Sequence, residues 1–319
     1  MPMFDDEGFA MRRLIQCLAV LTAIAFPGHA MAQDEPAGGN AMSGWRYDES
    51  HGGASEVTVG MPYLEIVGWP QGSRRPVSKP NVLTRSAAIL QSAGADCQVT
   101  DGYHPGDTRR RAPIFEVACA AGPGFLITAG DEPEVFNCLL LDAQEQARHE
   151  REPDTPVTNM CLLEGSRDAV AVLKPMAAAA GVTCDIDQAL WIGRMEDVGD
   201  RYEVGCDGRS GAWLETAVNG AVVTNTYDCL EVVKHGETCR FTTADELTAS
   251  VAALLPASGT PACSPTAGRL VGAAAGGDRY YELACSGGAG FIFRVRNDRY
   301  DISVPCAQAA GIMGGCRLE

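Results

Sequence analysis

The sequence predicts an α+β fold made of three tandem modules of about eighty residues, each with one helix over a small antiparallel sheet and each stapled by disulfides. Three observations predict this architecture. A cysteine spacing recurs three times, a strand-like phrase recurs with it, and a helical segment precedes each copy. Modules of this size bury little core, so covalent staples are expected wherever the compartment permits them.

The cysteine spacing defines the repeat. The first and second cysteines of every module lie 22 positions apart, whereas the third and fourth lie 23 positions apart in the first module and 10 in the other two. After Cys17, which precedes the modules, the cysteines in chain order are Cys97, Cys119, Cys138, Cys161, Cys184, Cys206, Cys229, Cys239, Cys263, Cys285, Cys306 and Cys316. The predicted modules are therefore 82–160, 161–238 and 239–319.

The favoured pairing joins the first cysteine to the second and the third to the fourth within each module, although four cysteines allow three connectivities. The first pair would bridge neighbouring strands. Because Cys161 and Cys239 also open the following modules, the second pair would staple one module to the next. The chain has no C-x-x-C pair with partner histidines, so disulfides are favoured over a metal site and no cofactor is predicted.

Ahead of the modules, 1–32 has the pattern of a secretory signal peptide. Two arginines precede a short apolar run at 14–26, and small residues after the run fit cleavage near Ala32. The run is shorter than the roughly 20 residues that a membrane-spanning helix needs. We expect removal of this segment and a periplasmic or secreted protein. The residues ahead of Met11 are acidic, which makes Met11 an alternative start.

The segment 33–81 is predicted to be a linker, because it begins rich in glycine, proline and alanine. It continues with two strand-like phrases, Ser55–Val59 and Tyr63–Trp69, before three prolines. These phrases predict a possible hairpin that docks on the first module.

Each module opens with a predicted helix. In the third module, Thr243 and Glu246 have the spacing of a capping box, and apolar residues then recur with helical period. The counterpart in the first module is Thr84–Gly94. In the second module it is 168–181, where Pro175 removes a backbone donor and is expected to kink or split the helix.

Short strands follow the helix. Tyr202, Val204 and Cys206 alternate with Glu203 and a glycine, which predicts a covered face for the first three and a water-facing position for the glutamate. A glycine cluster follows the second cysteine of every module and lies between two strand-like runs. These clusters are predicted to be hairpin turns and not phosphate-binding loops.

The composition argues against several partners. The formal net charge is −16, and only three lysines occur, at Lys79, Lys174 and Lys234. Such a chain repels polyanions, so nucleic acid and anionic membranes are excluded as expected partners. After the leader no apolar stretch approaches eighteen residues, so no transmembrane anchor is predicted.

No residue pattern predicts a catalytic site. The P-loop, H-E-x-x-H zinc-protease, G-x-S-x-G hydrolase and C-x-x-C-H haem motifs do not occur in the chain. The four histidines after the leader are each expected to be solvated surface residues: His51, His104, His149 and His235. One glutamate recurs in every module, at Glu116, Glu203 and Glu282. A residue present in every copy is expected to serve the module, facing solvent or pairing with an arginine such as Arg201 or Arg279.

Features that differ between modules are the candidates for a specific contact. Arg109, Arg110 and Arg111 form a cluster that occurs in the first module alone. The stretch 144–153, almost entirely charged or amide, is either a solvated excursion or a partner-contact loop. Tryptophans occur at Trp191 and Trp213 of the second module, where they are either core residues or a ligand platform, and Trp213 is kept as a possible partner contact.

Three functional hypotheses remain. The favoured one is an exported non-catalytic repeat protein that binds another protein or an envelope component. The alternatives are a structural or stress-resistance role in the envelope, and a hydrolase with paired carboxylates in one deep pocket. In outline, exported tandem modules of helix, antiparallel sheet and disulfides resemble the bacterial β-lactamase-inhibitor proteins. This resemblance is one of architecture and implies no particular activity.

Overall fold

The computed structural model describes residues 66–67, 77–108, 110–154, 161–195, 198–257, 261–288 and 290–318. The predicted signal peptide, its cleavage site, most of the predicted linker hairpin and Arg109 lie outside these residues. Within the described part of the chain, no helix is both long enough and apolar enough to cross a membrane.

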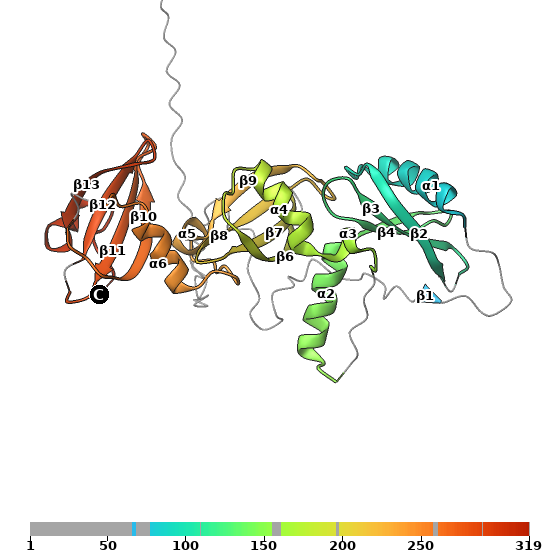
Figure 1. The fold of residues 1–319 in the computed structure, drawn as a ribbon, viewed down its shortest axis with the longest axis horizontal. Helices are drawn as coiled ribbons and strands as arrows, with labels where there is room; N and C mark the ends of the chain where they lie inside the picture. Colours follow the sequence, from blue (N-terminus) through green and yellow to red (C-terminus); the bar gives the residue numbers. More distant parts are fainter. Residues whose placement is uncertain are drawn as a thin grey trace, which may run out of the picture. The chain divides into compact units, whose positions relative to one another are not determined.

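The described chain forms three antiparallel sheets whose strands follow one another in chain order (Figure 1). The first sheet has five strands and the other two have four each. The first contains β1 (Ile66–Val67), β2 (Val99–Thr108), β3 (Pro113–Cys119), β4 (Phe125–Thr128) and β5 (Glu134–Asn137). The second contains β6 (Ile186–Met195), β7 (Gly199–Cys206), β8 (Arg209–Thr216) and β9 (Val223–Asp228). The third contains β10 (Pro265–Ala273), β11 (Arg279–Cys285), β12 (Phe291–Arg296) and β13 (Arg299–Pro305).

Helices precede and follow these sheets. Those ahead of a sheet are α1 (Lys79–Ser92), the pair α3 (Glu164–Arg167) and α4 (Ala169–Ala179), and α6 (Ala244–Ala252). The helix α1 contacts β2, α4 contacts β6, and α6 contacts β10. After each sheet a helix begins at a third cysteine: α2 (Cys138–Arg151), α5 (Cys229–Lys234) and the 3-10 helix η3 (Cys306–Gly311).

The helix boundaries refine the predictions. Thr243 and Glu246 do form a capping box at the start of α6. The first helix begins at Lys79 and not at Thr84, because Pro80 lies in the first turn, where a backbone donor has no partner to lose. Pro175 does not split the helix, since α4 continues through it. The chain instead breaks ahead of α4, at Asp168, whose carboxylate caps that helix.

The alternation predicted for β7 is correct for one face of the strand and wrong for the other. Tyr202, Val204 and Cys206 are buried, as their period predicts. The positions between them are buried too, so β7 is covered on both faces. The glycine clusters do lie between consecutive strands, and Gly208, with φ +65°, turns the chain from β7 into β8.

One buried cluster joins the first two sheets. It includes Ile114 and Leu126 of the first sheet with Tyr202 and Leu214 of the second. Within it, the Asn137 side-chain amide donates a hydrogen bond to the Tyr202 hydroxyl at 2.9 Å, and both groups are buried. The shared core therefore contains a polar contact that holds the second sheet against the first.

Removing the Tyr202 hydroxyl tests this link. The Tyr202→Phe variant leaves the Asn137 amide without its buried acceptor, so we expect the free energy of unfolding to fall by about 1–2 kcal/mol. Tyr300→Phe is the matched control, because that hydroxyl donates to Ser303 in a partly buried position and its loss should cost less than about 0.5 kcal/mol. Urea unfolding measures both; equal losses would contradict a structural role for the Tyr202 bond.

Candidate functional site: a repeated glutamate and disulfide clasp

The cysteines form six disulfides with the connectivity that the sequence favours. The first kind joins the second cysteine at the end of a strand to a cysteine 22 positions earlier: Cys97–Cys119, Cys184–Cys206 and Cys263–Cys285. The second kind joins the start of a helix to the segment that follows it: Cys138–Cys161, Cys229–Cys239 and Cys306–Cys316. The second kind closes each sheet unit and fixes where the next segment begins.

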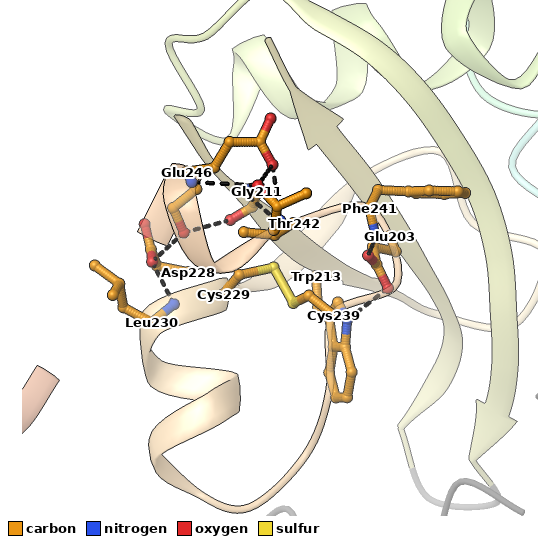
Figure 2. Close-up of a disulfide and its surroundings, with 12 residues drawn as sticks. Glu203, Gly211, Trp213, Asp228, Cys229, Leu230, Cys239, Phe241, Thr242 and Glu246 are labelled. Atoms are coloured by element: carbon orange, nitrogen blue, oxygen red, sulfur yellow. Dashed lines mark hydrogen bonds between the residues drawn. A yellow bond between two sulfur atoms is a disulfide. The ribbon is translucent and has the colours of Figure 1, made fainter. Parts of the chain in front are cut away.

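A buried glutamate lies beside the second kind of disulfide. Glu203, from the middle of β7, points toward the chain just after Cys239 (Figure 2). One of its carboxylate oxygens accepts the backbone N–H of Phe241 at 2.6 Å, and the other accepts the indole N–H of Trp213 at 3.2 Å. Its side chain is almost completely buried, so these donors take the place of water.

The other two repeated glutamates have the same environment. Glu116 accepts the backbone N–H groups of Leu162 at 2.8 Å and of Leu163 at 2.6 Å. Glu282 accepts those of Arg317 and Leu318, both at 2.7 Å. In all three places backbone N–H donors come from the two residues after the fourth cysteine. We call each strand glutamate, with its adjacent disulfide and these donors, a clasp.

The prediction that these glutamates face water is therefore wrong. Glu116, Glu203 and Glu282 are each at most 1% exposed, because the segment after the fourth cysteine covers that face of the sheet. The suggested arginine partners also differ. Arg201 pairs with Glu215 at 2.5 Å and Arg279 with Glu231 at 3.0 Å, whereas Glu282 pairs with Arg269. Each glutamate therefore accepts backbone N–H groups of its own unit from a buried position.

Two close contacts hold the segment after the clasp. The Ser166 hydroxyl of α3 donates to the Val117 carbonyl at 3.2 Å, and the Thr242 hydroxyl accepts the Gly211 N–H at 3.0 Å. A Cβ atom added to Gly124 would lie 2.2 Å from the Ser166 oxygen. This position in the hairpin must be glycine because the next segment packs directly on its backbone.

The clasps bring a carboxylate and two sulfurs within 4.8 Å of one another, which is the spacing of a metal site. Both sulfurs of each clasp are in a disulfide, so they offer no thiolate to a cation. Each carboxylate already accepts backbone N–H groups. This arrangement is suited to holding the chain and not to holding an ion.

The residues proposed as partner contacts lie in different environments. Arg110 and Arg111 are exposed at the turn between β2 and β3, where Arg111 has φ +66°. The prediction that Trp213 contacts a partner is wrong, because its side chain is 1% exposed and the Arg201 guanidinium lies 4.8 Å from its ring centroid. Trp191 is also a core residue, and its indole N–H donates to Asp200 at 3.1 Å.

The charged stretch 144–153 is not a loop. Up to Arg151 it continues α2, which is therefore much longer than α5. Near its end Glu150 pairs with Arg240 at 2.7 Å, beside the second clasp. The expected excursion is thus a helix that reaches the segment leading into the third sheet.

Among the histidines, His104 corrects the expectation of a solvated side chain. It is buried, with Nδ1 accepting the Val77 backbone N–H at 3.1 Å and Nε2 lying 3.2 Å from a carboxylate oxygen of Asp107. Acceptance at Nδ1 places the proton on Nε2, which then donates to Asp107. His149 is half-buried and His235 is exposed. His51 lies outside the described residues.

No protein-family model matches the chain, and no curated protein sequence matches it either.

The clasp predicts a specific stability loss. In Glu203→Gln an amide replaces one acceptor oxygen and sets a donor against a backbone or indole N–H, so we expect a loss of about 1–3 kcal/mol in the free energy of unfolding. Glu246→Gln is the control, because glutamine also completes a capping box. Denaturant unfolding should leave the control within about 0.5 kcal/mol of the parent. Equal free energies of unfolding for Glu203→Gln and Glu246→Gln would contradict a stabilising role for the clasp.

The same pair of variants predicts a pH dependence. Burial raises the pKa of the Glu203 carboxyl above its ordinary value, although the N–H donors of Phe241, Arg240 and Trp213 oppose the shift. The folded chain then binds this proton more readily than the unfolded chain does. The contribution of Glu203 is full below its unfolded pKa and declines as the pH rises through its folded pKa. Stability relative to Glu203→Gln, measured by urea unfolding, should therefore be greater at about pH 4 than at pH 7; an opposite slope contradicts the shift.

Proposed function

We propose that the chain is an exported, non-catalytic array of three repeated modules that binds another protein or an envelope component. Each module comprises one sheet, the helix ahead of it and one clasp. The recurrence of the clasp in all three sheets supports the repeat. Six disulfides support an oxidising compartment, the periplasm or the cell exterior, as the setting.

Three exposed valines on two adjoining segments carry the binding proposal, and we call them the valine cluster. Val198 in the loop before β7 and Val218 and Val222 in the loop before β9 are 39%, 43% and 67% exposed. The two loops lie against each other, because a Cβ atom added to Gly199 would be 2.8 Å from the backbone nitrogen of Val218. Grouped apolar side chains in water are typical of a surface that a partner covers.

Buried Asp200 holds these loops in place. Its carboxylate accepts the Trp191 indole N–H at 3.1 Å, the Arg194 guanidinium at 2.8 Å and the Asn219 backbone N–H at 2.7 Å. The valines are therefore presented on an ordered loop. An ordered loop loses less conformational entropy when a partner binds than a flexible loop does.

The same loop contacts the first module. The Asn219 carbonyl accepts the Asp96 backbone N–H at 3.2 Å, and a Cβ atom added to Gly122 would touch the side chain of Ala221. The valine cluster thus lies where two modules meet, which is where repeat arrays form their binding surfaces.

Carboxylates near a cavity are engaged with the protein itself. Asp228 and Glu231 line a cavity of about 220 Å³ that also borders Arg279. Asp228 accepts the Leu230 N–H at 2.7 Å and the Ser210 hydroxyl at 2.8 Å, and Glu231 pairs with Arg279. These bonds support a structural role for Asp228 and Glu231. They therefore favour the hypothesis of a binding protein over that of a hydrolase with paired carboxylates.

Photocrosslinking in the native host tests the proposal. A benzophenone amino acid placed at Val222 should yield a discrete larger species on irradiation. The control position is Ile302, an exposed apolar residue of β13, 52% exposed, where no such species is expected. The Val218→Asp, Val222→Asp protein should fold with little change in melting temperature, because both side chains are largely exposed.

Two outcomes would overturn partner binding. Equal cross-linking from Val222 and Ile302 would mean that the cluster has no special affinity. Absence of cross-links, combined with envelope defects on deletion that the double variant fully rescues, would favour the structural role in the envelope instead.

A further inference from the structure

A cavity of about 490 Å³ opens where α5, α6, β10 and the C-terminal segment meet. Its volume is within the range of small-molecule sites, roughly 300–1,000 Å³. Its lining consists of Leu230, Val233, Lys234, Leu247, Gly268, Arg269, Leu270, Val271, Met313 and Arg317.

The charge of this lining is opposite to that of the protein. The chain carries 41 acidic and 25 basic side chains, yet among the described residues the cavity is lined by three cations and no carboxylate. One of the cations is Lys234, from a chain with three lysines. On so acidic a protein, a cavity lined by chance would be expected to include carboxylates. A charged lining of cations alone therefore favours an anionic ligand.

Two of the three cations are available to a ligand. Arg269 is committed to Glu282, at 2.6 Å, and to the Gly315 carbonyl. Lys234 and Arg317 are exposed, and neither side chain forms an ion pair within the part of the chain that the structure describes. The rim therefore has two uncompensated charges beside an apolar lining that includes Leu230 and Leu270, which belong to one buried cluster.

The fold holds these cations in place. The Arg317 backbone N–H donates to Glu282 in the third clasp, and the preceding residue is in the Cys306–Cys316 disulfide. Lys234 lies in the last turn of α5, a helix that begins in the second clasp at Cys229. A Cβ atom on Gly272 would lie 2.7 Å from the Met313 sulfur and 3.6 Å from Cε of Lys234, which shows how closely these walls approach.

We propose that this cavity binds a small organic carboxylate with a short apolar chain. The carboxylate lies between Lys234 and Arg317, and the apolar chain covers Leu230 and Leu270. A polyanion is disfavoured because the rest of the surface repels it. This site is distinct from the valine cluster and does not rest on the proposed partner binding.

Isothermal titration calorimetry on the mature protein tests the site, with octanoate as the probe. We expect one octanoate per chain, with an affinity that falls as the ionic strength rises. Octan-1-ol has the same chain without the charge and should bind at least about fivefold more weakly. Equal affinity for the two probes, or no octanoate binding, would overturn the proposal.

Charge-neutralising variants locate the ligand. Lys234→Gln and Arg317→Gln should each weaken octanoate binding about fivefold, with unchanged unfolding curves because both side chains are exposed. The matched control is Arg299→Gln, which removes an exposed cation of the same sheet outside the cavity. An Arg299→Gln effect as large as the others would mean that net charge alone governs binding, which contradicts the site.

Discussion

Burial of a carboxylate is the constraint on which the three units depend. An ionised side chain loses its hydration inside a protein and stays folded only where donors replace the water. Glu116, Glu203 and Glu282 each find such donors in backbone N–H groups that follow a fourth cysteine. The adjacent disulfide holds those donors near the strand. Each clasp therefore fixes where one sheet ends and the next segment begins.

The third clasp differs from the other two in what surrounds its donor segment. Its donors, Arg317 and Leu318, belong to the last residues of the chain. Glu282 also has a cationic partner, Arg269, that the other two glutamates do not have in the described structure. The segment that carries these donors also lines a cavity, and the cations of that lining give the third unit its own chemistry.

The sequence predicted more of the covalent framework than of the buried polar groups. Cysteine spacing alone indicates the disulfides, because it recurs without reference to tertiary structure. The period of β7 correctly places Tyr202 and Val204 inside but says nothing of what covers the opposite face. The burial of Glu203 depends on a segment nearly forty positions away, so strand periodicity could not reveal it. Its recurrence beside a recurring cysteine was the available signal.

Backbone amide exchange is the most direct test of the clasps. In the folded protein the amides of Leu163, Phe241 and Leu318 should exchange about as slowly as those within the central strands, because each donates to a buried carboxylate. In Glu203→Gln the Phe241 amide should lose more protection than the Leu163 and Leu318 amides, because it loses its acceptor in addition to the global loss of stability. Exchange of all three at the rate of open loop amides in the unaltered protein would contradict the account.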